Sequence, residues 1–263
     1  MEPMILQSEL PFRAWDDPVL SRLPGTQPLK GPWLVRDEAF AGQMAARAVY
    51  LAERRAAGVM LDEAARPAAV ELLDLVLAEI GQDAGYRVGP DKVLRPDGVT
   101  VSLDRDDPMG TLALLVQEDL CLLDKRGDEH VLVGAVLLFP AFWRLVDKFM
   151  QPMMAIHAPV HEYTPDLGKR VQRMFDLIRP EMPVWRANWL TYDNARLWQA
   201  PLEPGAAPRA RPAPGTGYLR SERQTILRLP ETGVMVFSIH TYVWDVAGLP
   251  EDARESLTRA GQR

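Results

Sequence analysis

Two of this chain's four histidines, His157 and His161, lie four residues apart in a mostly apolar segment. On an α-helix this spacing puts both imidazoles on one face, as in many zinc sites. Pro159 lies between them, and proline removes a backbone donor and clashes with a helix that continues through it. The segment also lacks the HExxH pattern of zinc proteases. The sequence therefore argues against a zinc site built on this pair.

His157 by itself suggests two other environments. If a short helix begins at Pro152, then Met153, Ile156 and His157 share a face, and the imidazole points where the apolar side chains point. A histidine in that position either packs in the core with a backbone carbonyl as its partner or offers one nitrogen to the iron of a heme. The spacing alone favours the core histidine and leaves the heme ligand open.

The remaining histidines and the single cysteine carry weaker signals. Cys121 is another potential heme ligand, but it lies in a leucine-rich segment that is typical of a buried and inert thiol. His130 lies in a charged turn, where we expect it to be solvated. His240 shares a strand face with Ser238 and Tyr242, so it either lines a pocket or faces water.

A dense polar segment, RSERQT, covers residues 220–225. In an extended strand its even-numbered and odd-numbered residues lie on opposite faces, which separates Glu222 from Arg223. The segment is either an exposed edge strand whose charges prevent aggregation, or a site in which a carboxylate binds an amine and an arginine binds an anion such as a propionate. The segment QEDL at residues 117–120 raises the same two alternatives.

The first part of the chain predicts a proline-rich arm followed by helices. One helical pattern runs from about Asp37, placed as an N-cap, to Ala57, and Gly58 follows its end. A second helix begins at Pro67 and carries apolar residues at helical spacing as far as Ile80.

The second part of the chain alternates strands with helices. Residues 119–125 and 130–139 predict a buried hairpin, and residues 218–230 and 234–244 predict another. Between the hairpins we expect a helix at 140–150 with Phe142 on its apolar face, a helix at 164–180, a strand at 184–193 and a Pro/Gly-rich loop at 200–217. A polar helix closes the chain. These elements indicate an α+β protein in which helices cover one face of an antiparallel sheet.

Composition narrows the class of protein. The net charge of −6, without a dense run of Lys or Arg, argues against nucleic acid and anionic membranes as partners. No apolar segment approaches the roughly 20 residues of a transmembrane helix, and the first residues lack the features of a secretory signal, so we expect a cytoplasmic protein. One cysteine excludes internal disulfides and CxxC chemistry. No nucleotide-binding glycine motif is present, so redox chemistry would need electrons from another polypeptide.

Four linked segments resemble the alpha subunit of the heme-dependent oxidative N-demethylase family: VQEDLCLL, FPAFWRLVDKFMQPMMAIHAPV, WRANW and RSERQTILRLPETGVMVFSIHTYV. The resemblance covers roughly Asp107 to Leu249. It implies a PAS-like fold, in which a curved antiparallel sheet and flanking helices enclose a heme b. It also implies oxidative removal of a methyl group from a small secondary amine such as dimethylamine, with electrons from NADPH through separate flavin and iron–sulfur subunits.

The resemblance also implies roles for individual residues. His157 lies in the family's IHxPV segment and becomes the candidate axial ligand of the iron. Arg186 and Arg223 become candidate partners of the heme propionates. Glu222 and the tryptophans of WRANW become candidate neighbours of the substrate ammonium. His161 stands where the family usually has proline, and we expect it to lie outside the site.

The sequence thus predicts a heme monooxygenase subunit that uses dioxygen to demethylate a small methylated amine. Two alternatives remain open: a non-catalytic heme sensor or carrier on the same PAS-like scaffold, and a heme-free structural subunit. We expect one structural unit, with an N-terminal arm and helical extension at residues 1–106, a PAS-like heme-binding core at 107–249 and a C-terminal helix at 250–263.

Overall fold

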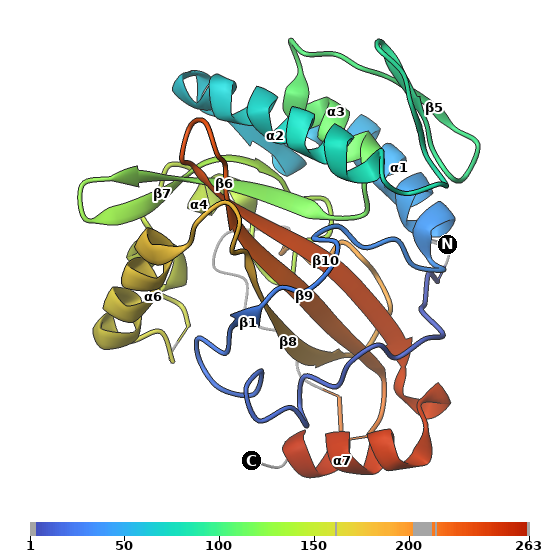
Figure 1. The fold of residues 1–263 in the computed structure, drawn as a ribbon. Coiled ribbons are helices and arrows are strands. Elements are labelled where there is room, and N and C mark those ends of the chain that lie inside the picture. Colours follow the sequence, from blue (N-terminus) through green and yellow to red (C-terminus); the bar gives the residue numbers. More distant parts are fainter. Residues whose placement is uncertain (1–3, 161, 202–211, 214, 262–263) are drawn as a thin grey trace.

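The computed structural model describes residues 4–160, 162–201, 212–213 and 215–261. Its centre is a seven-stranded antiparallel sheet with the strand order β1-β8-β9-β10-β6-β7-β2 (Figure 1). The strands are Gln27–Pro28 (β1), Val59–Leu61 (β2), Asp119–Arg126 (β6), Glu129–Val136 (β7), Val184–Tyr192 (β8), Tyr218–Arg228 (β9) and Met235–Asp245 (β10). Both predicted hairpins and the strand between them are therefore confirmed.

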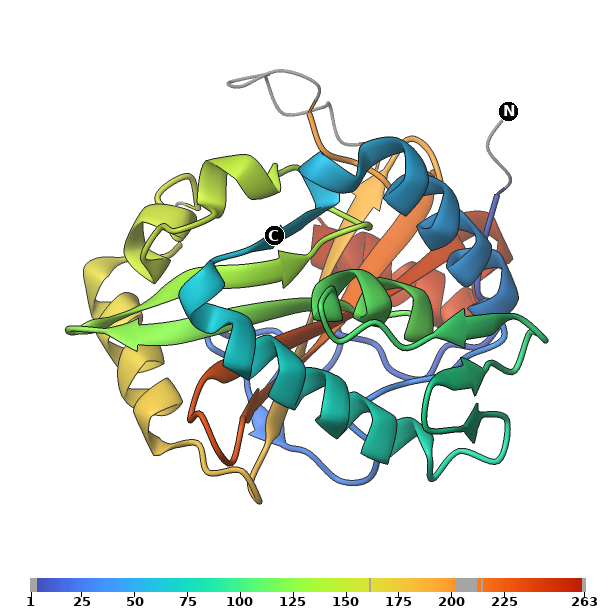
Figure 2. The ribbon, with the colours of Figure 1, turned by 90° about the horizontal axis from the view of Figure 1, so that it is seen from above.

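Helices pack on both faces of this sheet, and not on one face as the sequence predicts. Figure 2 looks down on the side covered by the blue, teal and green helices α1, α2 and α3. The short helices α4 and α5 and the longer α6 lie against the other face, and α7 lies at one end of the sheet (Figure 1). The bounds are Phe40–Gly58 (α1), Arg66–Ile80 (α2), Pro108–Leu115 (α3), Leu145–Lys148 (α4), Met153–His157 (α5), Pro165–Leu177 (α6) and Glu251–Gly261 (α7).

The two faces of the sheet bury different sets of residues. On one face, which we call the α6 face, Ile226 and Met235 pack with Val171 and Phe175 of α6. On the other, which we call the arm face, apolar residues of β6, β9 and β10 pack against α1–α3, and Trp185 and Tyr242 pack against the N-terminal arm. Side chains alternate between these faces along each strand.

Local signals place several helix ends correctly. Thr164 caps α6, because its side-chain oxygen accepts a hydrogen bond of 3.3 Å from the backbone N–H of Leu167. Pro67 lies in the first turn of α2, as predicted. Helix α1 begins later than predicted, at Phe40, although the Asp37 carboxylate still accepts a hydrogen bond from the backbone N–H of Ala39.

The helix predicted at residues 140–150 is wrong, since only Leu145–Lys148 is helical. Phe142 has a φ of 59° and is 38% exposed. The Pro140 carbonyl accepts a hydrogen bond from the backbone N–H of Gln199, and the Phe139 carbonyl accepts one from Arg220. These long-range contacts occupy the carbonyls that the first turn of such a helix needs, so tertiary structure overrides the local pattern.

The first 106 residues contribute more than the predicted arm and helices. They supply both edge strands of the main sheet, because β1 pairs with β8 and β2 pairs with β7. They also form a small three-stranded sheet of Arg87–Val88 (β3), Lys92–Leu94 (β4) and Thr100–Ser102 (β5). The predicted loop at 200–217 lies largely outside the described residues. Among the helices that are described, none is long and apolar enough to cross a membrane.

A buried ion cluster connects the arm to the sheet. His240 of β10 donates from Nδ1 to Glu118 and from Nε2 to Asp37, both at 3.1 Å. Burial alone lowers the pKa of His240, but the hydrogen bonds and charges of the two carboxylates outweigh burial and raise this pKa to about 9. His240 therefore neither faces water nor stays neutral, and its imidazolium ties Asp37 to the sheet.

This cluster predicts a pH-dependent contribution to stability. The pKa of folded His240, about 9, lies above its ordinary value of 6.5, so the stabilisation is complete below about pH 6.5 and is lost as the pH rises through 9. We expect the difference in free energy of unfolding between the wild type and His240→Gln to be larger at about pH 6 than at about pH 10 in urea titrations.

His130→Gln is the matched control for this experiment. Burial lowers the pKa of His130, so the contribution of His130 to the free energy of unfolding does not decline between about pH 6 and about pH 10. A His240→Gln difference that stays constant between the two pH values would contradict the ion cluster.

Candidate functional site

The α6 face carries five polar side chains in the middle of the sheet, which we call the α6-face cluster: Arg186 and Asn188 of β8, and Arg220, Glu222 and Gln224 of β9. The antiparallel register places Glu222 opposite Asn188 and Gln224 opposite Arg186. Because β9 pairs with β8 on one side and β10 on the other, the interpretation of residues 220–225 as an exposed edge strand is wrong.

Glu222 is held by three donors. Its Oε2 accepts hydrogen bonds of 3.0 Å from the side-chain amides of both Asn188 and Gln224. Its Oε1 lies 3.3 Å from Nη2 of Arg220. The side chain of Asn188 also accepts a hydrogen bond of 3.1 Å from the Glu222 backbone N–H. The carboxylate is therefore buried, charge-paired and fixed in one orientation.

Arg220 connects this carboxylate to the segments that lie over it. The guanidinium donates to the carbonyls of Leu197 and Phe139 as well as to Glu222. It is 3% exposed. Since it bonds to backbone carbonyls of two loops and to the one carboxylate of the cluster, its main effect is to hold those loops against the sheet.

Arg186 has no such compensation. Its one hydrogen bond is from Nη1 to Gln224, a neutral side chain, at 3.1 Å. Its Nε is buried and has no partner among the described residues. Burial lowers the pKa of Arg186, and the nearby charge of Glu222 raises it, but a guanidinium stays protonated in proteins. The two arginines and one glutamate of the cluster thus leave one positive charge without an anionic partner.

His157 lies near this charge, at the end of α5. Its Nδ1 donates to the Met153 carbonyl at 2.9 Å, and its ring stacks on Tyr163 with centroids 4.3 Å apart. Burial lowers the pKa of His157, and the positive charges of Lys148 and Arg186 lower it further. The imidazole is therefore neutral at pH 7. Its Nε2 has no hydrogen bond among the residues that the structure describes.

Arg223 does not join this site. It lies on the arm face, opposite Ala187 and His240, and donates to the carbonyls of Pro32 and Trp33 at 3.2 Å. The sheet therefore separates it from Arg186 and Glu222, as the alternation of residues along β9 requires.

The tryptophans of WRANW lie on the arm face too. Trp185 packs on Phe12 and Trp189 packs on Trp15. Of the residues that the sequence singles out, the structure brings together His157, Arg186 and Glu222 and leaves Arg223, Trp185 and Trp189 on the other side of the sheet.

The other candidate ligands are structural. Cys121 is buried on the α6 face, as predicted, and burial together with the charges of Asp119 and Glu222 raises the pKa of its thiol. His130 is 1% exposed and its Nδ1 lies 2.6 Å from the side-chain oxygen Oε1 of Gln172, so the expectation that it is solvated is wrong. His161 lies outside the described residues. In the described part of the chain, no group of three or more His, Cys, Asp or Glu side chains has the arrangement of a metal site.

Two residues near His157, Tyr163 and Gly168, were not singled out from the sequence. Tyr163 lies against His157 and its buried hydroxyl has no partner among the described residues. Gly168 of α6 leaves room for the Met154 side chain of α5, since an added Cβ would overlap the Met154 sulfur. The sequence carried a weak signal for both, a glycine inside an amphipathic helix and a tyrosine just before its cap.

The chain matches a family model described as "Haem-dependent oxidative N-demethylase, alpha subunit-like" over residues 26–261. This range includes the last part of the arm, the whole main sheet and α7, and so extends well beyond the segments that carry the resemblance in the sequence.

The chemistry of the α6-face cluster fits the heme that this family description implies. A heme needs a neutral imidazole whose second nitrogen is held by a hydrogen bond, and it carries two anionic propionates. His157 meets the first need, because its Nδ1 is held by a carbonyl and its Nε2 is unbonded. Arg186 meets the second, because its guanidinium lacks an anionic partner.

The unpaired charge predicts an unusual effect of mutation. We expect Arg186→Met to stabilise the heme-free protein by about 1 kcal/mol, because it removes a half-buried charge without a carboxylate partner. Urea unfolding of heme-free protein measures this. Arg220→Met is the matched control on the same face, and it should destabilise by about 3 kcal/mol because it leaves Glu222 without its cation. Equal destabilisation by both variants would contradict the assignment of Arg186 as the uncompensated charge.

Proposed function

The chain belongs to the haem-dependent oxidative N-demethylase, alpha subunit-like family, and from this premise we propose that it is the heme-binding, catalytic subunit of an enzyme that oxidatively demethylates a small amine. One observation carries the proposal. On the α6 face, the neutral imidazole of His157 has an unbonded Nε2 and lies close enough to Arg186 for that charge to lower its pKa. The Arg186 guanidinium itself has no anionic partner among the described residues. One ligand that offers both a metal and a carboxylate satisfies both groups.

We assign His157 as the axial ligand of the iron and Arg186 as the partner of a propionate. The family resemblance implies heme b, and the single cysteine agrees with it, because it excludes the CxxCH motif that attaches a c-type heme. Arg223 is not retained as a propionate partner, because it lies on the arm face.

The arrangement of the core supports a PAS-like description. Strands β6 to β10 have the spatial order β8-β9-β10-β6-β7, and α4, α5 and α6 are inserted between β7 and β8. This places the helix that bears His157 over the face of the sheet that bears Arg186. We propose that the heme lies between these helices and that face.

Glu222 is proposed to bind the substrate ammonium. The carboxylate is rigid, since Asn188, Gln224 and Arg220 hold it, and a fixed carboxylate orients an N-methyl group without reorganisation. The heme, when bound, supplies dioxygen binding and one-electron chemistry. The overall reaction consumes the N-methylated amine, dioxygen, two electrons and two protons and yields the amine with one methyl group fewer, formaldehyde and water.

By family resemblance, the electrons are proposed to come from NADPH through separate flavin and iron–sulfur subunits. The absence of a nucleotide-binding glycine motif and the single cysteine of this chain agree with an external source of electrons. Dimethylamine is the proposed substrate by family resemblance. The carboxylate of Glu222 by itself favours a cationic amine and does not distinguish one amine from another.

A second candidate is a non-catalytic heme carrier or sensor of the same family. It is favoured by the hydrogen bonds of Glu222, whose two oxygens already have three side-chain donors from the protein. In this case Glu222 only stabilises the cluster, and amine turnover does not occur.

The axial ligand is tested by absorbance spectroscopy of protein expressed with heme supplementation. We expect a strong Soret band in the wild type, a shifted or weaker band in His157→Gly, and restoration by added imidazole. Cys121→Ala is the control and should leave the spectrum unchanged. Colourless wild-type protein would overturn the heme assignment. An unchanged band in His157→Gly would mean that another residue is the axial ligand.

The role of Glu222 is tested by turnover. With dimethylamine and a reductase system, Glu222→Gln should lower kcat/KM by roughly 10–100-fold, since a charge-assisted hydrogen bond to the ammonium is lost, while the Soret band stays in place. Glu162→Gln removes an exposed carboxylate close to α5 in sequence and should have no effect. A heme-loaded wild type that shows no turnover with small methylated amines would favour the carrier or sensor.

A further inference from the structure

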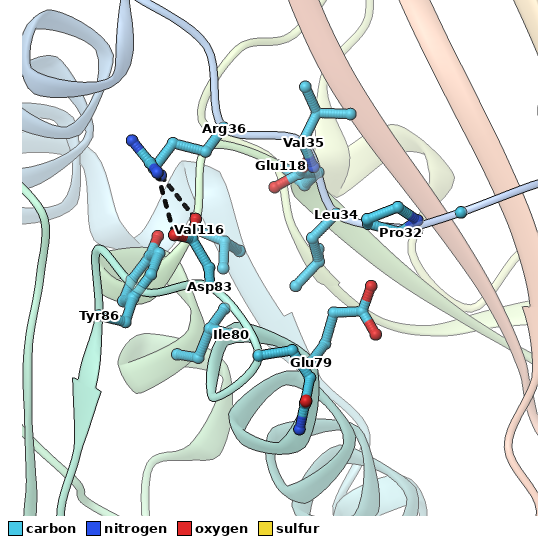
Figure 3. A pocket seen from close by; sticks show the side chains of 12 residues that line it. Pro32, Leu34, Val35, Arg36, Glu79, Ile80, Asp83, Tyr86, Val116 and Glu118 are labelled. Atoms are coloured by element: carbon cyan, nitrogen blue, oxygen red, sulfur yellow. Dashed lines mark hydrogen bonds and ion pairs between the residues drawn. The ribbon is translucent and has the colours of Figure 1, made fainter.

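A cavity of about 570 Å³ lies on the arm face (Figure 3). The main sheet separates this cavity from the α6-face cluster. Its walls come from residues 31–36 of the arm, the end of α2, the turn at 82–86 and the segment that enters β6. Cavities of this size hold small organic molecules in many proteins. No residue of the α6-face cluster lines it.

The walls combine apolar surface with carboxylates. Leu34, Val35, Ile80 and Val116 supply the apolar part. The one cation among the lining residues, Arg36, is already engaged, because its Nε and Nη2 donate to both oxygens of Asp83 at 2.6 and 2.9 Å (Figure 3). The remaining charged groups of the wall, Glu79 and Glu118, are both acidic.

Glu118 is the unusual member of this wall. It is 1% exposed, and its Oε1 accepts hydrogen bonds from the Val35 backbone N–H at 2.7 Å and from His240 at 3.1 Å. Its Oε2 is buried and has no hydrogen-bond partner among the described residues. Leaving a buried carboxylate oxygen without a donor costs on the order of 1–3 kcal/mol, so a donor brought by a ligand is favoured at this position.

Glu79 adds a second acceptor from α2. Its Oε1 accepts a hydrogen bond of 2.9 Å from the Trp33 backbone N–H. Figure 3 shows its carboxylate on the side of the cavity formed by Pro32 and Leu34. The phenol of Tyr86 adds no free donor, because it already donates to the Leu115 carbonyl at 2.9 Å. Apart from the neutral side-chain amide of Gln82, the polar groups free to bind a ligand are thus acceptors with negative charge.

We propose that this cavity binds an organic ammonium ion with an apolar body. The ammonium supplies the N–H donors that Glu118 and Glu79 lack, and the body packs on the apolar walls. An anionic ligand is repelled by both carboxylates, and an uncharged apolar ligand leaves Oε2 of Glu118 without a donor. The inference requires neither the heme nor the demethylation reaction.

Calorimetric titration of the full-length protein with its bound cofactor tests the proposal with three ligands of one shape. Phenethylammonium, 2-phenylethanol and 3-phenylpropionate share an aromatic body and differ in the charge of the head group. We expect phenethylammonium to bind at least tenfold more tightly than the alcohol, and the carboxylate not to bind. No binding of phenethylammonium, or equal binding of the alcohol, would overturn the proposal.

Three variants locate the bound ion. Leu34→Trp fills the cavity and should abolish binding, and Glu79→Gln should weaken it about tenfold. Glu53→Gln removes an exposed carboxylate of α1 and should leave affinity unchanged. Phenethylammonium binding that survives both Leu34→Trp and Glu79→Gln would place the ion outside this cavity and overturn the assignment.

Discussion

The ion pair between Arg47 and Asp119 is the contact on which the rest of the structure depends. Both side chains are at most 1% exposed, and their charged atoms lie 2.8 Å apart. Arg47 also donates to the carbonyls of Ala113 and Gln117, and Asp119 accepts from the backbone N–H groups of Leu138 and Phe139 at 2.8 Å. These hydrogen bonds offset the cost of burying the two charges, although Nη2 of Arg47 has no partner among the described residues. It therefore fixes α1, the end of α3, the start of β6 and the segment after β7 relative to one another.

This junction reaches both faces of the sheet. Phe139, held through its N–H by Asp119, accepts from Arg220 through its carbonyl, and Arg220 in turn pairs with Glu222 in the α6-face cluster. Glu118, one residue earlier than Asp119, binds His240 and lines the cavity on the arm face. The adjacent acidic residues of QEDL thus act on opposite sides of the sheet, and both proposed binding regions depend on the same short segment.

The two regions have opposite electrostatic character. The α6-face cluster has a guanidinium without an anion, and the cavity on the arm face has a buried carboxylate oxygen without a donor. A positive site suits the propionates of a heme, and a negative site suits an ammonium. The alternation of side chains along β9 places the adjacent residues Glu222 and Arg223 on opposite faces, so each contributes to a different electrostatic environment.

The sequence by itself determined the elements that depend on local spacing. These include both hairpins, the cap of α6, the short helix that carries His157, and the alternation that puts Arg186 and Glu222 on one face. Only the tertiary structure decided which face meets which layer, that β9 is an interior strand, that residues 140–144 are not helical, and that His130 and His240 are buried. The periodic spacing of apolar residues and the capping of helices depend on neighbours within a few residues along the chain. Burial, ion pairing and the use of the Phe139 and Pro140 carbonyls depend on residues about 60 to more than 200 positions away in the chain, whose approach no local pattern encodes.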